Sequence, residues 1–417
     1  MKVLMIAPQP FFEPRGTPIS VYQRLHGLSE LGCQIDLATY HIGSDVEIAG
    51  LTIIRAPRVP FIHKVKIGPS LAKIPLDLML LLLTIWLLLT RRYDAIHSHE
   101  EAAFFAAPLA WLFRTPHLYD MHSSLPKQLA NYNFGNYGPL VWLMERLERW
   151  TLRASDVVLT VGADLEAYVL RLNGQANHIR IENIAAQNET AVSPTHVAHL
   201  RHSLGLDGKQ AIVYTGTFEG YQGFEMLFAS AQTVVRQAPE AMFVMVGGKP
   251  EQVAHWQQET ARLGLADRVI FTGTVSLEES LHFLALADVL VSPRMAGLSV
   301  PLKIYSYLQS GSPIVATEIE AHTQVLAGET AVLTPPIPEA FADGLLRLLH
   351  DPDLRQTIGQ NARALAERDY SKESYLNKLE RAYLSIKHRK HISDIKLPDK
   401  SVPPHRKERR FSNFAGD

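Results

Sequence analysis

Short apolar runs recur along the chain, separated by segments long enough to form helices. In the first half these runs cover residues 3–7, 35–38, 51–54, 95–97, 117–121 and 157–161. A strand that is apolar throughout, rather than at every second residue, is typical of a parallel sheet covered by helices on both faces. The first half of the chain therefore predicts an α/β domain.

The second half repeats the pattern, with apolar runs at residues 211–214, 242–246, 269–271, 289–291, 314–316 and 332–333. Between the two series, residues 184–210 are polar and aperiodic, which indicates a linker. The sequence thus predicts two Rossmann-like, doubly wound parallel-sheet domains, residues 1–183 and 211–385, and the final helix of the second could pack back on the first. Residues 386–417 are basic and interrupted by proline, so we expect a disordered tail there.

Composition limits the class of protein. With 417 residues, 47% of them hydrophobic, the chain is long enough to bury two cores. Lys and Arg total 41 against 42 Asp and Glu, which gives no reason to expect nucleic acid as a partner. The opening MKVLMIAPQP has too short an apolar run for a signal peptide, and a single Cys33 suits a reducing compartment, so we expect a cytoplasmic protein.

Glycines and polar residues gather where the predicted strands end. The first half shows PRGTPIS at 14–20, HSHEE at 97–101 and YDMHSSLP at 119–126, and the second half shows YTGTFEGYQG, VMVGGKP and VSPRMAG. Glycine after a strand is commonest as turn chemistry, so each loop alone is weak evidence. Ligands of doubly wound sheets nevertheless bind outside the carboxyl ends of the strands, which makes these loops the place to look.

In combination and order these motifs resemble the retaining glycosyltransferases of family 4, over roughly residues 1–385. The resemblance implies a GT-B fold, in which an acceptor domain and a sugar-nucleotide domain face each other across a cleft. Gly311–Ser312–Pro313–Ile314–Val315–Ala316 match the family's Gly-x-Pro strand entry. The family's ribose-binding Glu, however, falls on Ser306, and its first acidic position falls near Arg294 or Met295.

Two further departures concern the donor diphosphate. The family's Arg and Lys that reach this group correspond to Thr217 and Gln222 here, whereas Arg294 and Lys303 stand on the neighbouring loop and helix start. Because charge develops on the leaving diphosphate, we expect Arg294 and Lys303 to be the catalytic cations in their place; the alternative is that both are solvated rim charges. The expected donor-binding residues are Gly16, Thr17, Gly216, Thr217, Gln222, Gly247 and Ser306.

On the acceptor side, His122 follows a predicted strand and resembles the family's catalytic His beside the reacting sugar. A histidine there can hydrogen-bond a sugar hydroxyl or hold a proton. His99 and Glu100 are weaker acceptor-side candidates. By residue type His97, His99 and His122 could bind a metal, but no further ligand spacing supports a closed site, and the resemblance implies neither a metal nor a cofactor beyond the nucleotide sugar.

The segment at residues 74–94 is apolar nearly all round. Its uninterrupted apolar part, 78–89, is shorter than the roughly 20 residues that cross a bilayer. Two alternatives stay open: a helix buried against the sheet, or a helix at an anionic membrane surface, with Lys64, Lys66, Lys73, Arg91 and Arg92 near the headgroups.

These features predict a glycosyltransferase that moves a sugar from a nucleotide diphosphate to an acceptor hydroxyl with retention. A lipid-linked or cell-envelope glycan would be the acceptor, and the enzyme would lie in the cytoplasm or peripherally on the membrane. Two alternatives remain: a sugar-nucleotide epimerase of the same fold, and a non-catalytic relative that binds a nucleotide or a partner. The missing Glu at Ser306 and the Thr217 and Gln222 replacements favour the last.

Overall fold

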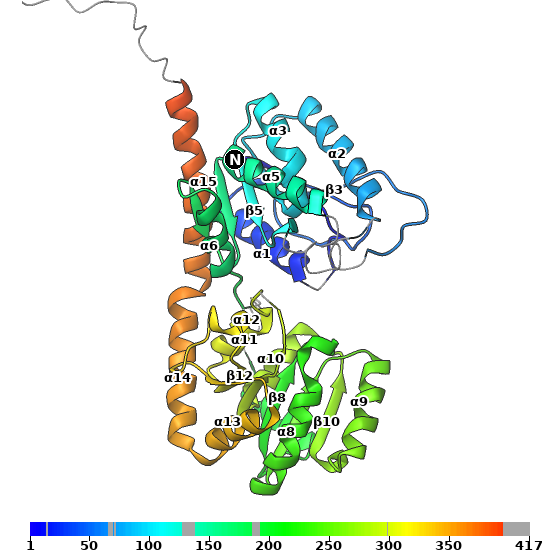
Figure 1. Ribbon diagram of the computed structural model, residues 1–417, viewed down its shortest axis with the longest axis vertical. Coiled ribbons are helices and arrows are strands. Elements are labelled where there is room, and N and C mark those ends of the chain that lie inside the picture. The colour runs from blue at the N-terminus through cyan, green and yellow to red at the C-terminus, as the bar shows by residue number, and fades with distance from the viewer. Residues whose placement is uncertain are drawn as a thin grey trace, which may run out of the picture.

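The chain folds into two α/β lobes (Figure 1). This computed structural model describes residues 1–13, 16–65, 70, 72–126, 138–185, 192–297 and 299–394, without the side chains of residues 140 and 387–394. Each lobe is built on one parallel sheet, and the helices pack on both faces of each sheet. The predicted class, two Rossmann-like doubly wound domains, is confirmed.

The amino-terminal lobe holds a seven-stranded sheet in the order β3-β2-β1-β4-β5-β6-β7. Its strands are β1 Lys2–Ala7, β2 Gln34–Thr39, β3 Leu51–Arg55, β4 Ala95–His99, β5 His117–Met121, β6 Val157–Thr160 and β7 His178–Arg180. Alternate residues of β1 face opposite layers, since Val3 and Met5 belong to one hydrophobic core cluster and Leu4 and Ile6 belong to another. Strand β7 was not predicted, because a three-residue His-Ile-Arg edge strand has no apolar run.

The carboxy-terminal lobe holds a six-stranded sheet in the order β10-β9-β8-β11-β12-β13. Its strands are β8 Gln210–Thr215, β9 Ala241–Val246, β10 Val269–Gly273, β11 Val289–Ser292, β12 Ile314–Thr317 and β13 Val332–Thr334. Each of the six contains one predicted apolar run. The two central strands, β8 and β11, are covered by helices on both faces, which is why their sequences do not alternate between polar and apolar residues.

The helices of the amino-terminal lobe are α1 Gly16–Glu30, α2 Lys73–Thr90, α3 Ala103–Phe113, α5 Gly138–Ala154 and α6 Ala163–Leu172, with a short 3₁₀ turn, η1, at Glu100–Ala102. The carboxy-terminal lobe contains α8 Phe224–Gln237, α9 Pro250–Arg262, α10 Leu277–Ala285, α11 Leu302–Ser310, α12 Glu320–Thr323, α13 Pro338–His350 and α14 Pro352–Asp369, with 3₁₀ turns η3 Gly220–Gln222 and η4 Ala266–Arg268.

The segment predicted as an irregular linker contains a helix, α7 Pro194–Ser203. Hydrophobic periodicity does not reveal this helix, because its sequence is mostly polar and none of its residues is fully buried. The start of the helix is fixed locally: Ser193 is the N-cap and accepts a hydrogen bond from the backbone N–H of His196, and Pro194 occupies the first helical position.

The last helix, α15 Lys372–Asp394, returns to the amino-terminal lobe, so that α14 and α15 run along one side of both lobes (Figure 1). Its buried residues Tyr375, Leu379, Ala382, Tyr383 and Ile386 belong to the core beneath the first sheet. Within the described residues the helix continues to Asp394, past residue 386, where the sequence predicts the start of a disordered tail. Residues 395–417 lie outside the described part of the chain.

Helix α2 is buried along one face and exposed along the other. Leu76, Leu80 and Leu87 pack into the core over the first sheet, while Leu82, Trp86 and Leu89 are exposed. By length and composition alone α2 could cross a membrane, although a third of it is buried in the lobe.

Candidate active site

Both sheets reverse their strand order at the centre, and several of the predicted site residues lie at these two points. In the first sheet the reversal lies between β1 and β4, where Thr17, the residue after Gly16, contacts Glu100. In the second sheet it lies between β8 and β11, which are followed by Gly216 and the loop carrying Arg294. Loops that leave such a switch point in opposite directions open a crevice for ligands.

The carboxyl ends of the two sheets are turned toward the junction of the lobes. Gly162 directly follows β6, and Gln324 follows β12 and α12. The backbone N–H of Asp164 donates a hydrogen bond of 3.3 Å to Oε1 of Gln324. A methyl group on Gly162 would lie only 2.8 Å from that oxygen, so the glycine permits this close approach.

Glu100 has the most unusual environment in the amino-terminal half of the site. It adopts a left-handed φ of 50°, uncommon outside glycine. Thr17 Oγ1 donates to its Oε1 at 3.4 Å, and Ser123 Oγ donates to its Oε2 at 2.9 Å. Burial, reinforced by the charge of Glu101, raises the pKa of Glu100 to about 7. This carboxyl can therefore take up or release a proton near neutral pH.

His122, the residue after β5, lies in a buried polar cluster. Its Nε2 is 3.0 Å from Nδ1 of His99 and 3.5 Å from Oδ1 of Asp120. Burial lowers the pKa of His122 to about 4, although Asp120 opposes the shift. The imidazole is thus neutral at physiological pH and suits hydrogen bonding to a hydroxyl better than charge stabilisation.

A buried network beneath His122 was not predicted. The Arg24 guanidinium donates to Oδ2 of Asp120 at 2.8 Å and to the Tyr375 hydroxyl at 2.9 Å. His97 contacts the Tyr383 hydroxyl at 2.7 Å and Asp120 Oδ2 at 3.3 Å. The sequence signal for this network was Asp120, a charged residue within the predicted strand 117–121. Its partners Arg24 and α15 are distant from it in sequence and gave no local signal.

His97, His99 and Asp120 bring their ligand atoms within 4.8 Å of one another, a spacing that could accommodate a metal ion. The Asp120 carboxylate already forms an ion pair with the Arg24 guanidinium, and both side chains are fully buried. A cation bound here would lie beside a second buried positive charge that no solvent screens, which makes the group unsuited to a metal.

In the carboxy-terminal half, Lys303 in the first turn of α11 meets Gly216 and Gln222. Its Nζ lies 3.6 Å from the centroid of the Tyr214 ring and donates to Gln222 Oε1 at 3.4 Å. A Cβ on Gly216 would be 3.1 Å from that ammonium. Burial, followed by the charge of Arg294, lowers the pKa of Lys303 well below its ordinary value. Among the described residues no carboxylate forms an ion pair with this cation, which suits it to an anion.

Arg294 is bound to its own loop. Its guanidinium donates to the carbonyls of Ala296 at 2.7 Å and Ser299 at 3.2 Å, and lies 5.1 Å from the centre of the Tyr221 ring. The backbone carbonyl of Arg294 accepts a hydrogen bond from Thr317 Oγ1. Arg294 therefore shapes the loop after β11, and its charge adds to that of Lys303 from close by.

The remaining predicted donor residues surround this cation less directly. Gly247 has a φ of 118°, and a Cβ there would meet the Gly216 carbonyl at 2.0 Å, so glycine at 247 is required where the loops after β8 and β9 touch. Thr217 is exposed, and its carbonyl accepts a hydrogen bond of 2.7 Å from Tyr214. Ser306, half-buried, lies one helical turn beyond Lys303.

Several supporting residues of this half were not predicted. A side chain on Gly223 would collide with the Pro293 carbonyl at 2.1 Å, so glycine lets the loop after β8 pass the loop after β11. Tyr307 accepts at its hydroxyl a hydrogen bond of 2.9 Å from the backbone N–H of Thr215. His322 Nε2 lies 2.8 Å from Oγ of Ser292, the last residue of β11.

Comparison with known proteins shows the family. The model described as "Glycosyl transferase 4-like domain" matches residues 15–183, and "Glycosyl transferases group 1" matches residues 209–351. The sulfoquinovosyl transferase SQD2 of Arabidopsis thaliana is 24% identical over 376 residues, which cover 88% of this chain and 70% of that protein. The phosphatidyl-myo-inositol mannosyltransferase of Mycobacterium tuberculosis is 23% identical over 380 residues, 85% of this chain and 89% of that protein.

Among solved structures, Anabaena Alr3699/HepE in complex with UDP superposes with a TM-score of 0.72 at 18% identity, covering 92% of this chain and all of that one. The two family matches divide at the segment that joins the two sheets, and together they span both halves of the site. The chain belongs to the group 1 glycosyltransferases and has their GT-B fold.

Proposed function

We propose that this protein transfers a sugar from a nucleotide diphosphate to an acceptor hydroxyl with retention of configuration. The observation that carries the proposal is Lys303, a half-buried ammonium beside Gly216 at the switch point of the second sheet, with no counter-charge in the part of the chain that the structure describes. A diphosphate is the chemical group that such a cation, flanked by close-approaching glycine backbone, would recognise. UDP bound in the Anabaena structure supports a nucleoside diphosphate as the ligand.

In the proposed reaction the bond between the sugar's anomeric carbon and the diphosphate oxygen breaks, and a bond to the acceptor oxygen forms on the same face. The proton of the acceptor hydroxyl passes to the departing diphosphate, whose charge Lys303 stabilises with a contribution from Arg294. Neutral His122 hydrogen-bonds a hydroxyl of the transferred sugar, and Glu100, with a pKa of about 7, lies on the acceptor side with His99. None of these steps requires a metal or another cofactor.

Product analysis tests the proposal. Purified protein would be screened against a panel of nucleotide sugars and acceptors, and the products identified by mass spectrometry. We expect free nucleoside diphosphate only when an acceptor is present. Release of nucleoside diphosphate without an acceptor, together with an altered sugar, would indicate an epimerase. Nucleotide binding without any turnover would indicate a non-catalytic relative.

His122→Ala provides the residue-level test of the same proposal. We expect turnover at saturating acceptor to fall by about 100-fold or more, the range typical of a hydrogen-bonding or proton-handling group at the reacting centre. Inhibition by UDP should stay unchanged, because His122 is in the lobe opposite Lys303. Full turnover in this variant would make His122 a structural residue.

For the acceptor, we infer a molecule held at a membrane. Helices α2, α3 and α5 of the amino-terminal lobe carry an exposed apolar surface, here called the apolar face, made up of Leu78, Leu82, Trp86, Leu89, Trp111, Leu112, Trp142, Leu143 and Trp150. Trp111 is 82% exposed and Leu89 is 70% exposed. Exposed cations lie on or next to the same helices: Arg92, Arg114, Arg146, Arg149 and Arg153.

Tryptophan prefers the boundary between hydrocarbon and headgroups, and arginine attracts anionic lipids, so this combination fits an anionic membrane surface. Such docking would hold the amino-terminal lobe at a membrane that contains a lipid-linked substrate, and two relatives are named for lipid-related substrates, phosphatidyl-myo-inositol among them. Residues 395–417 of the predicted basic tail lie outside the described residues.

Vesicle co-sedimentation tests this surface. We expect the protein to bind anionic vesicles at low salt, less at moderate salt, and little with zwitterionic vesicles. A Trp111→Ser, Leu112→Ser double variant should reduce binding several-fold. Ile337→Ser, at an exposed apolar position of the other lobe, is the control and should bind like the unmodified chain. Absence of binding to anionic vesicles at low salt would contradict the proposal.

A further inference from the structure

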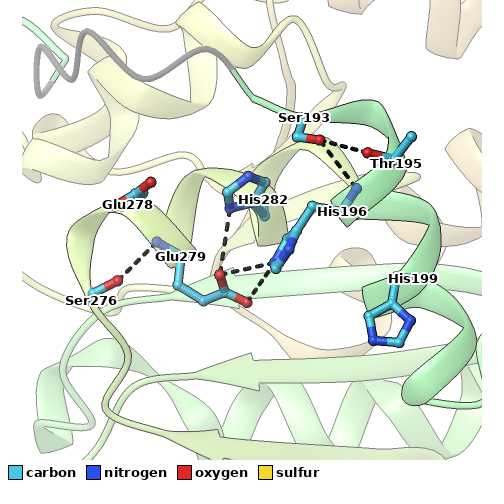
Figure 2. A pocket seen from close by; sticks show the side chains of 8 residues that line it. All are labelled: Ser193, Thr195, His196, His199, Ser276, Glu278, Glu279 and His282. Carbon is cyan, nitrogen blue, oxygen red and sulfur yellow. Dashed lines mark hydrogen bonds and ion pairs between the residues drawn. The ribbon is translucent and has the colours of Figure 1, made fainter.

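A second group of polar side chains lies between α7 and α10, on residues that belong to none of the loops at the switch points. The two helices contact each other and line an open pocket (Figure 2). His196 comes from α7, and Glu279 and His282 come from α10. In Figure 2 both imidazole rings point toward the Glu279 carboxylate.

The distances in this group match a metal site. His196 Nε2 lies 3.1 Å from Glu279 Oε2 and 3.3 Å from Oε1, and His282 Nδ1 lies 3.5 Å from Oε2. All three ligand atoms lie within 4.8 Å of one another. Ligands bound tetrahedrally to zinc at 2.0–2.1 Å are separated by about 3.3 Å, so a cation can enter with small side-chain adjustments.

One buried nitrogen of the group is unsatisfied. Nδ1 of His282 has no hydrogen-bond partner among the described residues, although the side chain is only 9% exposed. Leaving a buried polar atom unpaired costs about 1–3 kcal/mol. A cation beside Glu279 would receive the lone pair of this nitrogen, so the missing hydrogen bond favours a ligand at this place.

Local structure holds the ligands in place. Ser276 caps α10 by accepting a hydrogen bond of 3.0 Å from the backbone N–H of Glu279, and Ser193 caps α7 in the same way at 3.3 Å from His196. Each of these ligands is therefore the third residue of a capped helix. His282 lies one turn beyond Glu279 on the same helix face.

The charge and ligand types restrict the ion. Two helix N-termini disfavour a cation, but the carboxylates of Glu278 and Glu279 in the first turn of α10 offset them. Two imidazoles and one carboxylate favour zinc and neighbouring transition metals over calcium or magnesium, which prefer oxygen ligands. The side chains of His196 and Glu279 are 43% and 31% exposed, which leaves an entry path and room for a water ligand.

We propose that His196, Glu279 and His282 bind one zinc-class divalent cation, completed by water, which fastens α7 to the carboxy-terminal lobe. Because α7 belongs to the segment that joins the two sheets, the ion would stabilise the start of the second lobe. This site is independent of the proposed transfer reaction, and its test does not use activity. His199 lines the same pocket one turn further along α7 but is not one of the three grouped ligands (Figure 2).

Titration of the tag-free, chelator-treated protein with Zn²⁺, followed by calorimetry, tests the site, with Co²⁺ absorption reporting the coordination. We expect one saturable ion per chain and a higher unfolding temperature with Zn²⁺ than without. His196→Gln and Glu279→Gln should each weaken Zn²⁺ binding by at least about 100-fold, since even the loss of an outer-shell partner costs 10–100-fold. His199→Gln, the matched control, should bind like the unmodified chain.

His196→Gln changes a half-exposed side chain, so its unfolding temperature without metal should equal that of the unmodified protein. Loss of binding in this variant then reports a lost ligand rather than a misfolded protein. Two results would overturn the proposal: no saturable one-to-one Zn²⁺ binding, or binding of unchanged affinity in both His196→Gln and Glu279→Gln.

Discussion

Replacing Lys303 by methionine is expected to lower turnover by about 100-fold or more, which corresponds to about 3 kcal/mol of transition-state stabilisation. Methionine keeps the unbranched stem against the Tyr214 ring and removes only the charge. The loss should be large because Lys303 is half-buried and solvent cannot replace it as the leaving diphosphate gains charge. Steady-state kinetics with saturating acceptor measures this effect.

The same variant has a second signature, in the pH dependence of UDP inhibition. Burial and the nearby Arg294 lower the pKa of Lys303 well below its ordinary value, so the empty site loses the ammonium charge as pH rises. A bound diphosphate favours the protonated form, and binding must then take up a proton. Inhibition by UDP should therefore weaken as pH rises through the lowered pKa, and Lys303→Met should remove this component of the pH dependence.

Lys209→Met is the matched control, because Lys209 precedes the opposite end of β8 and pairs with Glu240. It should leave turnover and UDP inhibition unchanged. Arg294→Met should lower turnover less than Lys303→Met, since the Arg294 guanidinium already donates to two loop carbonyls. If turnover and UDP inhibition are unchanged in both Lys303→Met and Arg294→Met, then Lys303 and Arg294 are rim charges. That result would favour the alternative of a non-catalytic relative.

Asp120→Asn is expected to destabilise the fold by about 3–5 kcal/mol, the range for removing one partner of a buried ion pair. Arg24 and Asp120 are both 0% exposed and 2.8 Å apart, and asparagine leaves the guanidinium charge uncompensated in the core. Chemical unfolding followed by circular dichroism measures the change. Tyr383→Phe, which removes a neutral hydrogen bond to His97 in the same network, should cost only about 1 kcal/mol.

The pH dependence distinguishes the charge of Asp120 from its shape. Burial by itself would raise the pKa of Asp120, but Arg24 and the surrounding histidines outweigh burial and hold this pKa well below the ordinary 3.8. A depressed carboxyl pKa gives stability that is fully present above the unfolded value and is lost as pH falls toward the folded value. The stability difference between the unmodified chain and Asp120→Asn should be constant above pH ~5 and shrink only in acid.

An equal stability of Asp120→Asn and the unmodified chain at neutral pH would contradict this account of the core. If the variant folds, its turnover reports on positioning, because Asp120 lies 3.5 Å from the His122 ring. We expect turnover to fall with UDP inhibition unchanged, as for His122→Ala. Asp120 would then act through His122 as a positioning residue.

The sequence by itself determined the two-sheet architecture and most strands, because strands buried on both faces are mostly apolar and are therefore visible as short apolar runs. It also indicated Gly16, Glu100, Gly216 and Lys303, since ligands of doubly wound sheets lie where strands end. It missed β7 and α7 for the complementary reason: each is mostly polar and held by edge pairing or capping, which leave no hydrophobic period.

Only the tertiary structure decided which residues meet. Arg24 and Asp120 are 96 positions apart, and His196 and Glu279 are 83 apart, so neither pair has a local signal. The sequence also did not show which side of α2 is exposed, because the helix is apolar nearly all round. The packing of residues such as Leu80 against the sheet determines which face stays in contact with solvent. Whether a segment forms a strand or a helix follows from local periodicity. Ion pairs, metal ligands and exposed surfaces depend instead on which distant segments the fold brings into contact.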